Sequence, residues 1–195
     1  MNSVVSLREF KERARHAPTL VLVDMHHGSP AANSGASKAA GEAIANCRAM
    51  LRHARACQMP VAFTRQVVSP TSMLASPIYP RWIQGFEPSR WDMIFDRHLP
   101  SCYASADFRD MAEDVGGHYV VAGQFAELAC LSTAIDAFHR DHHPIFLSDA
   151  LVVRGNSELP AELMGKSLIS ILSLYSQVAR TQPWIAELHS VGAPI

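Results

Sequence analysis

The sequence lacks any strong imbalance of charge. Among its 195 residues, 17 lysines and arginines stand against 18 aspartates and glutamates, so the formal net charge is −1. Nucleic acids and anionic membrane surfaces attract proteins with a clear basic excess. The balance therefore gives no reason to expect either partner, and it leaves little charge repulsion to oppose self-association.

Long apolar runs and patterned cysteines are also lacking. No apolar stretch approaches the roughly 20 residues that a membrane-spanning helix needs. The segment Met1–His16 mixes apolar with charged side chains and has no apolar core typical of a signal peptide. The four cysteines contain no C-x-x-C pair, so neither a zinc site nor a disulfide framework is indicated. We expect a cytoplasmic protein with reduced thiols.

Short apolar runs alternate with longer periodic segments along the chain. The runs predict strands at Thr19–Asp24, Met59–Thr64, Met93–Asp96, His118–Gly123 and Pro144–Ser148, with a weaker signal near Trp184–Leu188. The periodic segments predict helices at Ser37–Gln58, Ala106–Val115, Phe125–His139 and Pro160–Val178. Such alternation favours a parallel sheet with helices on both faces. We therefore predict a single α/β domain over residues 1–195.

Two of these helices carry apolar side chains at three- and four-residue intervals, which predicts a buried stripe on each. The stripe of the first helix consists of Ile44, Cys47, Leu51 and Ala54. That of the third consists of Leu128, Leu131, Ile135 and Phe138.

The segment Gln66–Arg90 is the least regular part of the sequence. It contains four prolines and predicts a long loop. Long loops inside compact domains are usually functional, so we expect this one to govern the choice of substrate.

Polar residues follow the predicted strands where a parallel sheet binds its ligands, at the carboxyl ends of the strands. Asp24 ends the first strand, Gln66 follows the second, Arg97 follows the third, and Gly123–Cys130 follows the fourth. The helix that begins in this last segment points its amino terminus at the same edge, which favours an anion or a thiolate there.

Three segments in this order resemble the motifs of one known family. Val23–Met25 looks like a strand that ends in a catalytic aspartate, Asp96–Tyr103 looks like a central motif with a basic residue four positions before a serine, and Ala122–Phe138 looks like a signature segment that continues to Ala150. Over nearly the whole chain the sequence resembles the isochorismatase-like hydrolases. The resemblance implies a three-layer, Rossmann-like fold with a parallel six-stranded sheet between helices, in homodimers or higher homo-oligomers.

The cysteine branch of that family uses an aspartate, a lysine and a nucleophilic cysteine. By resemblance, Asp24 takes the aspartate position, Arg97 the lysine position and Ala129 the cysteine position, while Cys130 lies one residue out of register. Adjacent residues of an α-helix project about 100° apart. Cys130 is therefore either a small buried residue or a nucleophile rescued by an irregular first helical turn.

The isochorismatase branch carries glycine beside a cysteine, and the Ala129–Cys130 pair resembles that arrangement. In that branch the aspartate assists proton transfer to a vinyl ether and water completes the cleavage, without a covalent intermediate. Arginine stays charged at ordinary pH and its fork matches a carboxylate. Arg97 would accordingly bind a substrate carboxylate, or would merely pair with a nearby acid.

Further candidates for the pocket are His26, Gln66, Trp82, Tyr103 and Phe125. Gln66 could instead be a solvated loop residue, and the three aromatic residues could instead belong to the apolar core. The histidines near Asp24 and near the end of the third helix show no metal-binding spacing, so we predict neither a metal nor another cofactor.

Three functions follow as hypotheses. The first is a hydrolase that acts on a small carboxylate-bearing molecule without a cysteine nucleophile, with Asp24 as its acid/base. The second is a cysteine amidase that uses Cys130. The third is a binding protein that has kept the fold and lost the chemistry.

Overall fold

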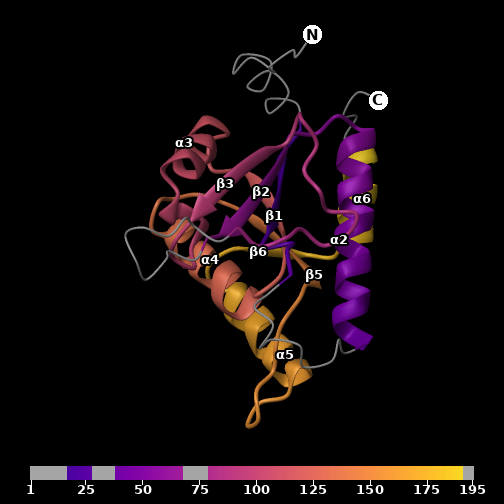
Figure 1. The fold of residues 1–195 in the computed structure, drawn as a ribbon, viewed down its shortest axis with the longest axis vertical. Coiled ribbons are helices and arrows are strands. Elements are labelled where there is room, and N and C mark those ends of the chain that lie inside the picture. Colours follow the sequence, from indigo (N-terminus) through magenta and orange to yellow (C-terminus); the bar gives the residue numbers. More distant parts are fainter. Residues whose placement is uncertain (1–16, 28–37, 68–78, 191–195) are drawn as a thin grey trace.

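The computed structural model describes residues 17–27, 38–67 and 79–190. Six parallel strands form one sheet in the order β3-β2-β1-β4-β5-β6 (Figure 1). The strands are β1 (Thr19–Val23), β2 (Val61–Gln66), β3 (Met93–Arg97), β4 (Tyr119–Gly123), β5 (Ile145–Leu151) and β6 (Gln177–Ala179). The predicted parallel six-stranded α/β fold is therefore confirmed.

Helices cover both faces of the sheet (Figure 1). One face carries α2 (Lys38–Ala56) and α6 (Thr181–Ser190). The other carries α3 (Ala106–Asp114), α4 (Leu131–Phe138) and α5 (Ala161–Leu172), together with a one-turn 3₁₀ helix η2 (Cys102–Ala104) and a π-helical turn η3 (Ala126–Cys130). No described helix is long and apolar enough to cross a membrane.

The central strand β1 shows why two helical layers are needed. Its five residues are all buried, and successive side chains of a strand point to opposite faces. Leu20 and Leu22 join the apolar cluster under α2 and α6, whereas Val21 and Val23 join the cluster under α3, α4 and α5. Because both faces of this strand are buried, its sequence is a continuous apolar run rather than an alternation of apolar and polar residues.

The carboxyl-terminal region differs from the prediction. The helix predicted over Pro160–Val178 ends at Leu172, and the short edge strand β6 follows it. Ser173 and Ser176 turn their hydroxyls to helix carbonyls, and such bonds offer the backbone an alternative to continued helix. The weak strand signal at Trp184–Leu188 is also wrong, because these residues lie in α6.

The amino end of α6 is held by β5. The Asp149 carboxylate accepts hydrogen bonds from both the backbone N–H and the hydroxyl of Thr181, at 2.8 and 2.7 Å. This contact fixes the last helix on the sheet, although Asp149 lies 32 residues earlier in the chain.

The stripe predicted to be buried on the third helix is only partly so. Leu128 and Phe138 are 48% and 54% exposed, and Leu131 and Ile135 are half-buried. The residues of η3 and α4 that face the sheet are small, mainly alanines, with Cys130 and Thr133 among them. Small side chains let this helix pack closely on the sheet, so the large ones point outward. On α2 three of the four predicted residues, Cys47, Leu51 and Ala54, are buried, and Ile44 is half-buried.

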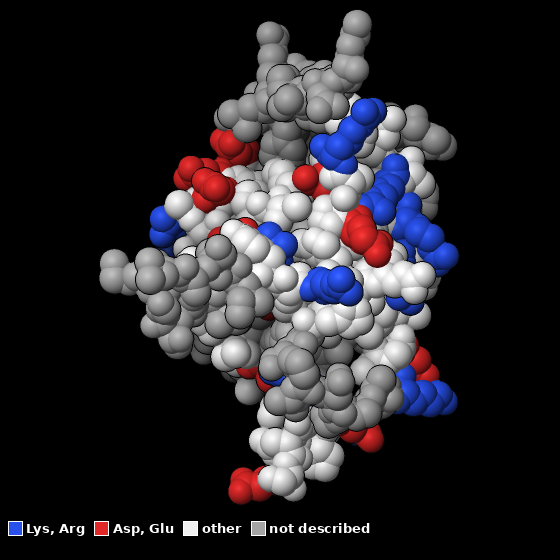
Figure 2. All heavy atoms as spheres, viewed as in Figure 1, with Lys and Arg blue, Asp and Glu red and all other residues white. Residues whose placement is uncertain are grey.

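Charge is unevenly spread over the surface even though the totals nearly cancel. In the view of Figure 2, lysine and arginine side chains gather on the side of α2, and aspartate and glutamate side chains gather on the side of α3.

Candidate active site

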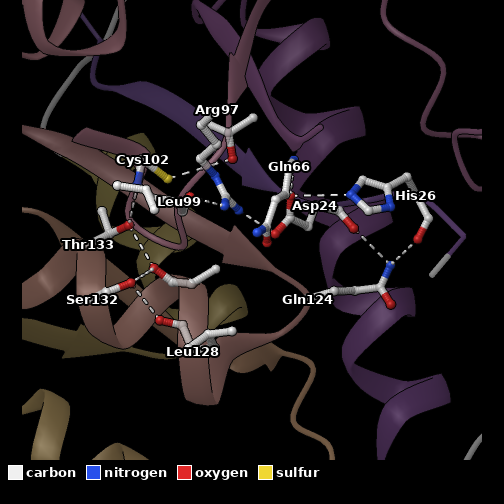
Figure 3. A network of polar contacts seen from close by, with 12 residues as sticks. Asp24, His26, Gln66, Arg97, Leu99, Cys102, Gln124, Leu128, Ser132 and Thr133 are labelled. Atoms are coloured by element: carbon white, nitrogen blue, oxygen red, sulfur yellow. Dashed lines mark hydrogen bonds and ion pairs between the residues drawn. The ribbon is translucent and has the colours of Figure 1, made fainter. Parts of the chain in front are cut away.

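The carboxyl ends of β1, β2 and β3 bring three sequence-predicted residues together (Figure 3). Asp24 directly follows β1, while Gln66 and Arg97 are the last residues of β2 and β3. These strands are neighbours in the sheet, with Gln66 and Arg97 paired in register. The strand-end argument from the sequence therefore located this cluster correctly.

Asp24 and Arg97 form a buried ion pair. Arg97 Nη2 donates to Asp24 Oδ2, and each residue is only 1% exposed. The other carboxylate oxygen, Oδ1, accepts the backbone N–H of Gln66 at 2.9 Å and lies 3.3 Å from His26 Nε2. Both oxygens of Asp24 are thus bound, so its position in the site is fixed.

The Arg97 guanidinium is held from two sides and keeps one donor unused. Its Nη1 donates to the carbonyl oxygen of Leu99 at 2.8 Å. Its Nε is buried and has no hydrogen-bond partner in the described part of the chain. Buried donors are almost always paired, so this one marks a place where a ligand oxygen or a water would be stabilised.

Two residues of the site adopt the left-handed backbone conformation that side chains normally avoid. Asp24 has φ of 51° and Phe125 has φ of 53°. Non-glycine residues in this region cost free energy and concentrate at functional sites. Asp24 directly follows β1, and Phe125 lies between β4 and η3.

His26 lies between the aromatic candidates. Its ring centroid is 6.4 Å from that of Trp82 and 6.1 Å from that of Phe125, and its backbone forms an isolated antiparallel bridge with Trp82. Of the predicted pocket residues, His26 therefore contacts Asp24, and Trp82 and Phe125 contact the His26 ring. The loop that carries Trp82 is described only in part, since residues 68–78 lie outside the described ranges.

Gln124 is a site residue that the sequence reasoning did not single out. Its side-chain amide donates to the carbonyl oxygens of Asp24 at 3.1 Å and His26 at 3.2 Å (Figure 3). It ties the turn after β1 to the turn after β4. Its place directly after Gly123, at the end of a predicted buried strand, was the available signal.

Tyr103 does not line this site. Its hydroxyl lies 2.8 Å from the Tyr119 hydroxyl and 2.7 Å from Nδ1 of His142. Tyr119 begins β4, so the phenol points toward the amino end of that strand, away from Asp24. Burial raises the pKa of Tyr103 to about 12. The prediction of a substrate-contacting Tyr103 is corrected to a core position.

Cys102 was also missed and lies near the ion pair. Its sulfur is 3.6 Å from the Thr64 hydroxyl, and its backbone N–H donates to Thr133 Oγ1 at 2.9 Å. Burial raises the pKa of the Cys102 thiol, and the Arg97 charge opposes this rise. Cys102 directly follows Ser101 in the central motif, and this position was the sequence signal that could have identified it as a site residue.

Ala129 and Cys130 are both buried in the π-helical turn η3. Burial raises the pKa of the Cys130 thiol well above its usual range, with the Cys102 and Asp24 groups adding to the rise. The backbone N–H groups of Leu128 and Ala129 both donate to the carbonyl oxygen of Phe125, at 3.0 and 2.7 Å. Burial therefore disfavours the thiolate form of Cys130, and the N–H groups of Leu128 and Ala129 are already engaged.

No group of three or more histidine, cysteine or acidic side chains in the described ranges is arranged to hold a metal ion. Of the histidines that follow α4, His142 is buried. Its Nδ1 lies 2.7 Å from the Tyr103 hydroxyl, and its Nε2 lies 3.4 Å from the Glu113 carboxylate. His143, its neighbour, is exposed.

The fold and the site together define a three-layer α/β protein with a buried aspartate–arginine pair at the carboxyl edge of its sheet. The model of one family, the isochorismatase domain, matches residues 18–164. The chain therefore belongs to the isochorismatase family.

Among curated proteins, the chain is 23% identical over 124 residues to enterobactin synthase component B of Escherichia coli (strain K12). This match covers 56% of the chain and 44% of that relative, so it spans less than half of the longer protein.

Solved structures show the same fold at low sequence identity. A cysteine hydrolase from Pseudomonas syringae pv. phaseolicola 1448A has a TM-score of 0.75 and 22% identity, with 90% of this chain and 93% of that one covered. A putative hydrolase of the isochorismatase family from Chromobacterium violaceum ATCC 12472 also has a TM-score of 0.75, at 18% identity and with 97% and 100% covered. N-carbamoylsarcosine amidase from Thermoplasma acidophilum has a TM-score of 0.65 at 20% identity, with 85% and 97% covered.

Proposed function

We propose that the protein is a hydrolase that acts on a small carboxylate-bearing molecule without a cysteine nucleophile. The observation that carries the proposal is the ion pair of Asp24 and Arg97 at the ligand-binding edge, beside Cys102 and Cys130, whose burial raises the pKa of each thiol. A thiol reacts through its thiolate, so water is the better candidate for the attacking group.

In this mechanism Asp24 is the acid/base. For a vinyl ether, the carboxyl group would deliver a proton to the terminal carbon and water would add to the resulting oxocarbenium carbon. Asp24 would take back the proton that the water loses as it forms the hemiketal. The hemiketal then collapses to a carbonyl compound and an alcohol, with its hydroxyl proton passing to the departing oxygen. Its contact with His26, at 3.3 Å, gives the carboxylate a neighbour through which a proton can be exchanged.

Arg97 has two roles in the same proposal. Its Nη2 holds the Asp24 carboxylate, and its buried Nε–H, which has no partner among the described residues, would donate to an oxygen of the substrate. Charged donors bind carboxylates more strongly than neutral ones do. This supports an anionic substrate that enters beside the His26, Trp82 and Phe125 rings.

The first test is turnover with two probes, isochorismate followed by pyruvate release and N-carbamoylsarcosine followed by ammonia release. For a probe that is hydrolysed, we expect Asp24→Asn to lower kcat at least about a hundredfold, since a positioned acid/base contributes roughly 10²–10⁴-fold. The matched control is Asp96→Asn, which removes a more exposed carboxylate on β3, two strands away from β1 in the sheet. Unchanged turnover in Asp24→Asn would remove Asp24 from the mechanism.

The same ion pair also supports the alternative of a binding protein, because Asp24 and Arg97 neutralise each other and neither charge is then available for catalysis. Its signature would be calorimetric binding of isochorismate or N-carbamoylsarcosine without hydrolysis, together with recovered turnover in an Arg97→Lys, Ala129→Cys double variant.

The cysteine-amidase alternative makes a separate prediction about thiol reactivity. Cys47, Cys102 and Cys130 are fully buried with raised pKa values, whereas Cys57 is partly exposed. We therefore expect iodoacetamide to modify Cys57 first in the folded protein, as read by peptide mass spectrometry. In a Cys57→Ser variant, fast modification of Cys130 or Cys102 would instead favour the amidase.

A further inference from the structure

The imidazole of His26 has an acceptor oxygen at each of its two nitrogens. Its Nε2 lies 3.3 Å from Oδ1 of Asp24 (Figure 3), and its Nδ1 lies 3.3 Å from the carbonyl oxygen of His27. A neutral imidazole has one N–H group and one bare nitrogen, whereas the imidazolium ion has two N–H groups. If Asp24 is ionised, only the imidazolium can donate to both oxygens.

The contacts of Asp24 favour its ionised form. Arg97 Nη2 donates to Oδ2, and the backbone N–H of Gln66 donates to Oδ1. An aspartate is ordinarily ionised at about pH 7, and a neighbouring cation and a donated N–H both stabilise the carboxylate. The proton in the contact between Asp24 and His26 therefore belongs to His26.

His142 shows the contrasting arrangement at the same depth. Both histidine side chains are 7% exposed, and each has a carboxylate at Nε2, which for His142 is that of Glu113 at 3.4 Å. At Nδ1, however, His142 meets the Tyr103 hydroxyl at 2.7 Å, and a hydroxyl can donate. A neutral imidazole satisfies both partners of His142. The partner at Nδ1, rather than burial, therefore distinguishes the two histidines.

The other charges packed around His26 are paired with one another. An arginine stacks on each of the two rings that flank the imidazole and is bound to its own acid, in the groups Trp82–Arg65–Asp96 and Phe125–Arg154–Glu127. His27, the next residue in the chain, is exposed. Asp24 and Arg97 are thus the charged groups that bear directly on His26. A protonated His26 and Arg97 together would outweigh the single negative charge of Asp24, which suits an anionic substrate.

We propose that His26 is protonated in the resting protein and supplies the proton that Asp24 delivers to the substrate. The inference rests on the proposed function and adds the proton source that a carboxylate bound to Arg97 needs. In the forward step the Nε2–H bond of His26 breaks as an O–H bond forms at Oδ1 of Asp24, and this O–H bond breaks as the C–H bond of the substrate forms. The proton lost by the attacking water returns through Asp24 to Nε2, so His26 ends the cycle protonated.

The charge of His26 can be read by NMR of the full-length protein with ¹⁵N-labelled histidine, because protonated and bare ring nitrogens resonate apart. At about pH 7, where an exposed histidine is mostly neutral, we expect two protonated ring nitrogens on His26 and one on His142, the internal control. Assignment through the backbone makes this comparison possible in the wild type alone. In Asp24→Asn, which removes the carboxylate charge, His26 should lose one of its two ring protons while His142 is unchanged.

His26→Gln separates the hydrogen bond from the proton source, because a glutamine amide can donate to Asp24 but cannot give up a proton. For isochorismate or N-carbamoylsarcosine, whichever is hydrolysed, we expect kcat to fall about a hundredfold, as for loss of a proton-transfer group, and KM to change little. In the wild type kcat should decline as rising pH removes the His26 proton, and this decline should be absent in His26→Gln. The control is His143→Gln, whose side chain is 63% exposed and which should behave as the wild type does.

A neutral His26 in the wild type would overturn the proposal, as would a His26 that keeps both ring protons in Asp24→Asn. Wild-type turnover and pH dependence in His26→Gln would overturn it as well. These results would leave the role of Asp24 intact. Unchanged turnover in Asp24→Asn would instead overturn the proposed function, and the proton transfer from His26 with it, even if NMR showed His26 to be protonated.

Discussion

Replacing Arg97 with methionine should destabilise the fold by about 3–5 kcal/mol, the usual cost of removing one partner from a buried ion pair. Among the described residues, the variant would leave Asp24, which is 1% exposed, with the Gln66 N–H and His26 as its side-chain partners. A buried charge without an opposite charge is far costlier than the pair itself. The measurement is the midpoint of urea unfolding, followed by circular dichroism.

The neighbouring strand offers a matched control. Arg65 pairs with Asp96 at 2.8 Å, one residue before the site on β2 and β3, but these side chains are 14% and 38% exposed. Exposed ion pairs contribute about 0–1 kcal/mol, so Arg65→Met should cost far less than Arg97→Met. Equal costs for the two variants would show that the Asp24–Arg97 pair is hydrated in solution.

A double variant separates stability from chemistry. Asp24→Asn combined with Arg97→Met removes both charges, and replacing a whole buried pair is often close to neutral. We expect the double variant to be more stable than Arg97→Met alone and to remain inactive. Activity in this folded protein would contradict the role proposed for Asp24.

The sequence predicted the strands well where they are buried on both faces. Continuous apolar runs mark β1 and β4 because no side of those strands meets water. The short edge strand β6 was missed for the opposite reason, since Gln177 is exposed and its neighbours are only partly buried. A three-residue strand of that kind has no periodic signature.

The site was predicted as far as chain topology determines it. Asp24, Gln66 and Arg97 could be placed together because the ends of adjacent parallel strands share one edge. The direction of a single side chain has no comparable signal, and Tyr103 therefore turned out to face the core. The outward stripe at Leu128 and Phe138 has a related cause. Periodicity reveals an apolar stripe but not whether the stripe faces the sheet or solvent.

The junction between β1 and β4 contains the position least tolerant of change. Gly123 has φ of 146°, and a Cβ added there would lie 2.2 Å from the carbonyl oxygen of Val23. That oxygen accepts the backbone N–H of Gln124 at 2.8 Å, so it cannot move aside without losing the bond. We expect Gly123→Ala to destabilise the protein by about 4 kcal/mol or more, in the range of the most severe single substitutions.

Gly41 provides the opposite case within the same chain. It lies inside α2, and a Cβ added there meets nothing within 4 Å. Alanine favours a helix over glycine by about 0.8–1 kcal/mol, so Gly41→Ala should raise the urea midpoint while Gly123→Ala lowers it sharply. If both variants shifted the midpoint in the same direction, the close approach of β1 and β4 would not be what requires glycine. Shifts in opposite directions would show that the absence of a side chain at Gly123 is what allows β1 and β4, and with them Asp24 and Gln124, to lie this close together.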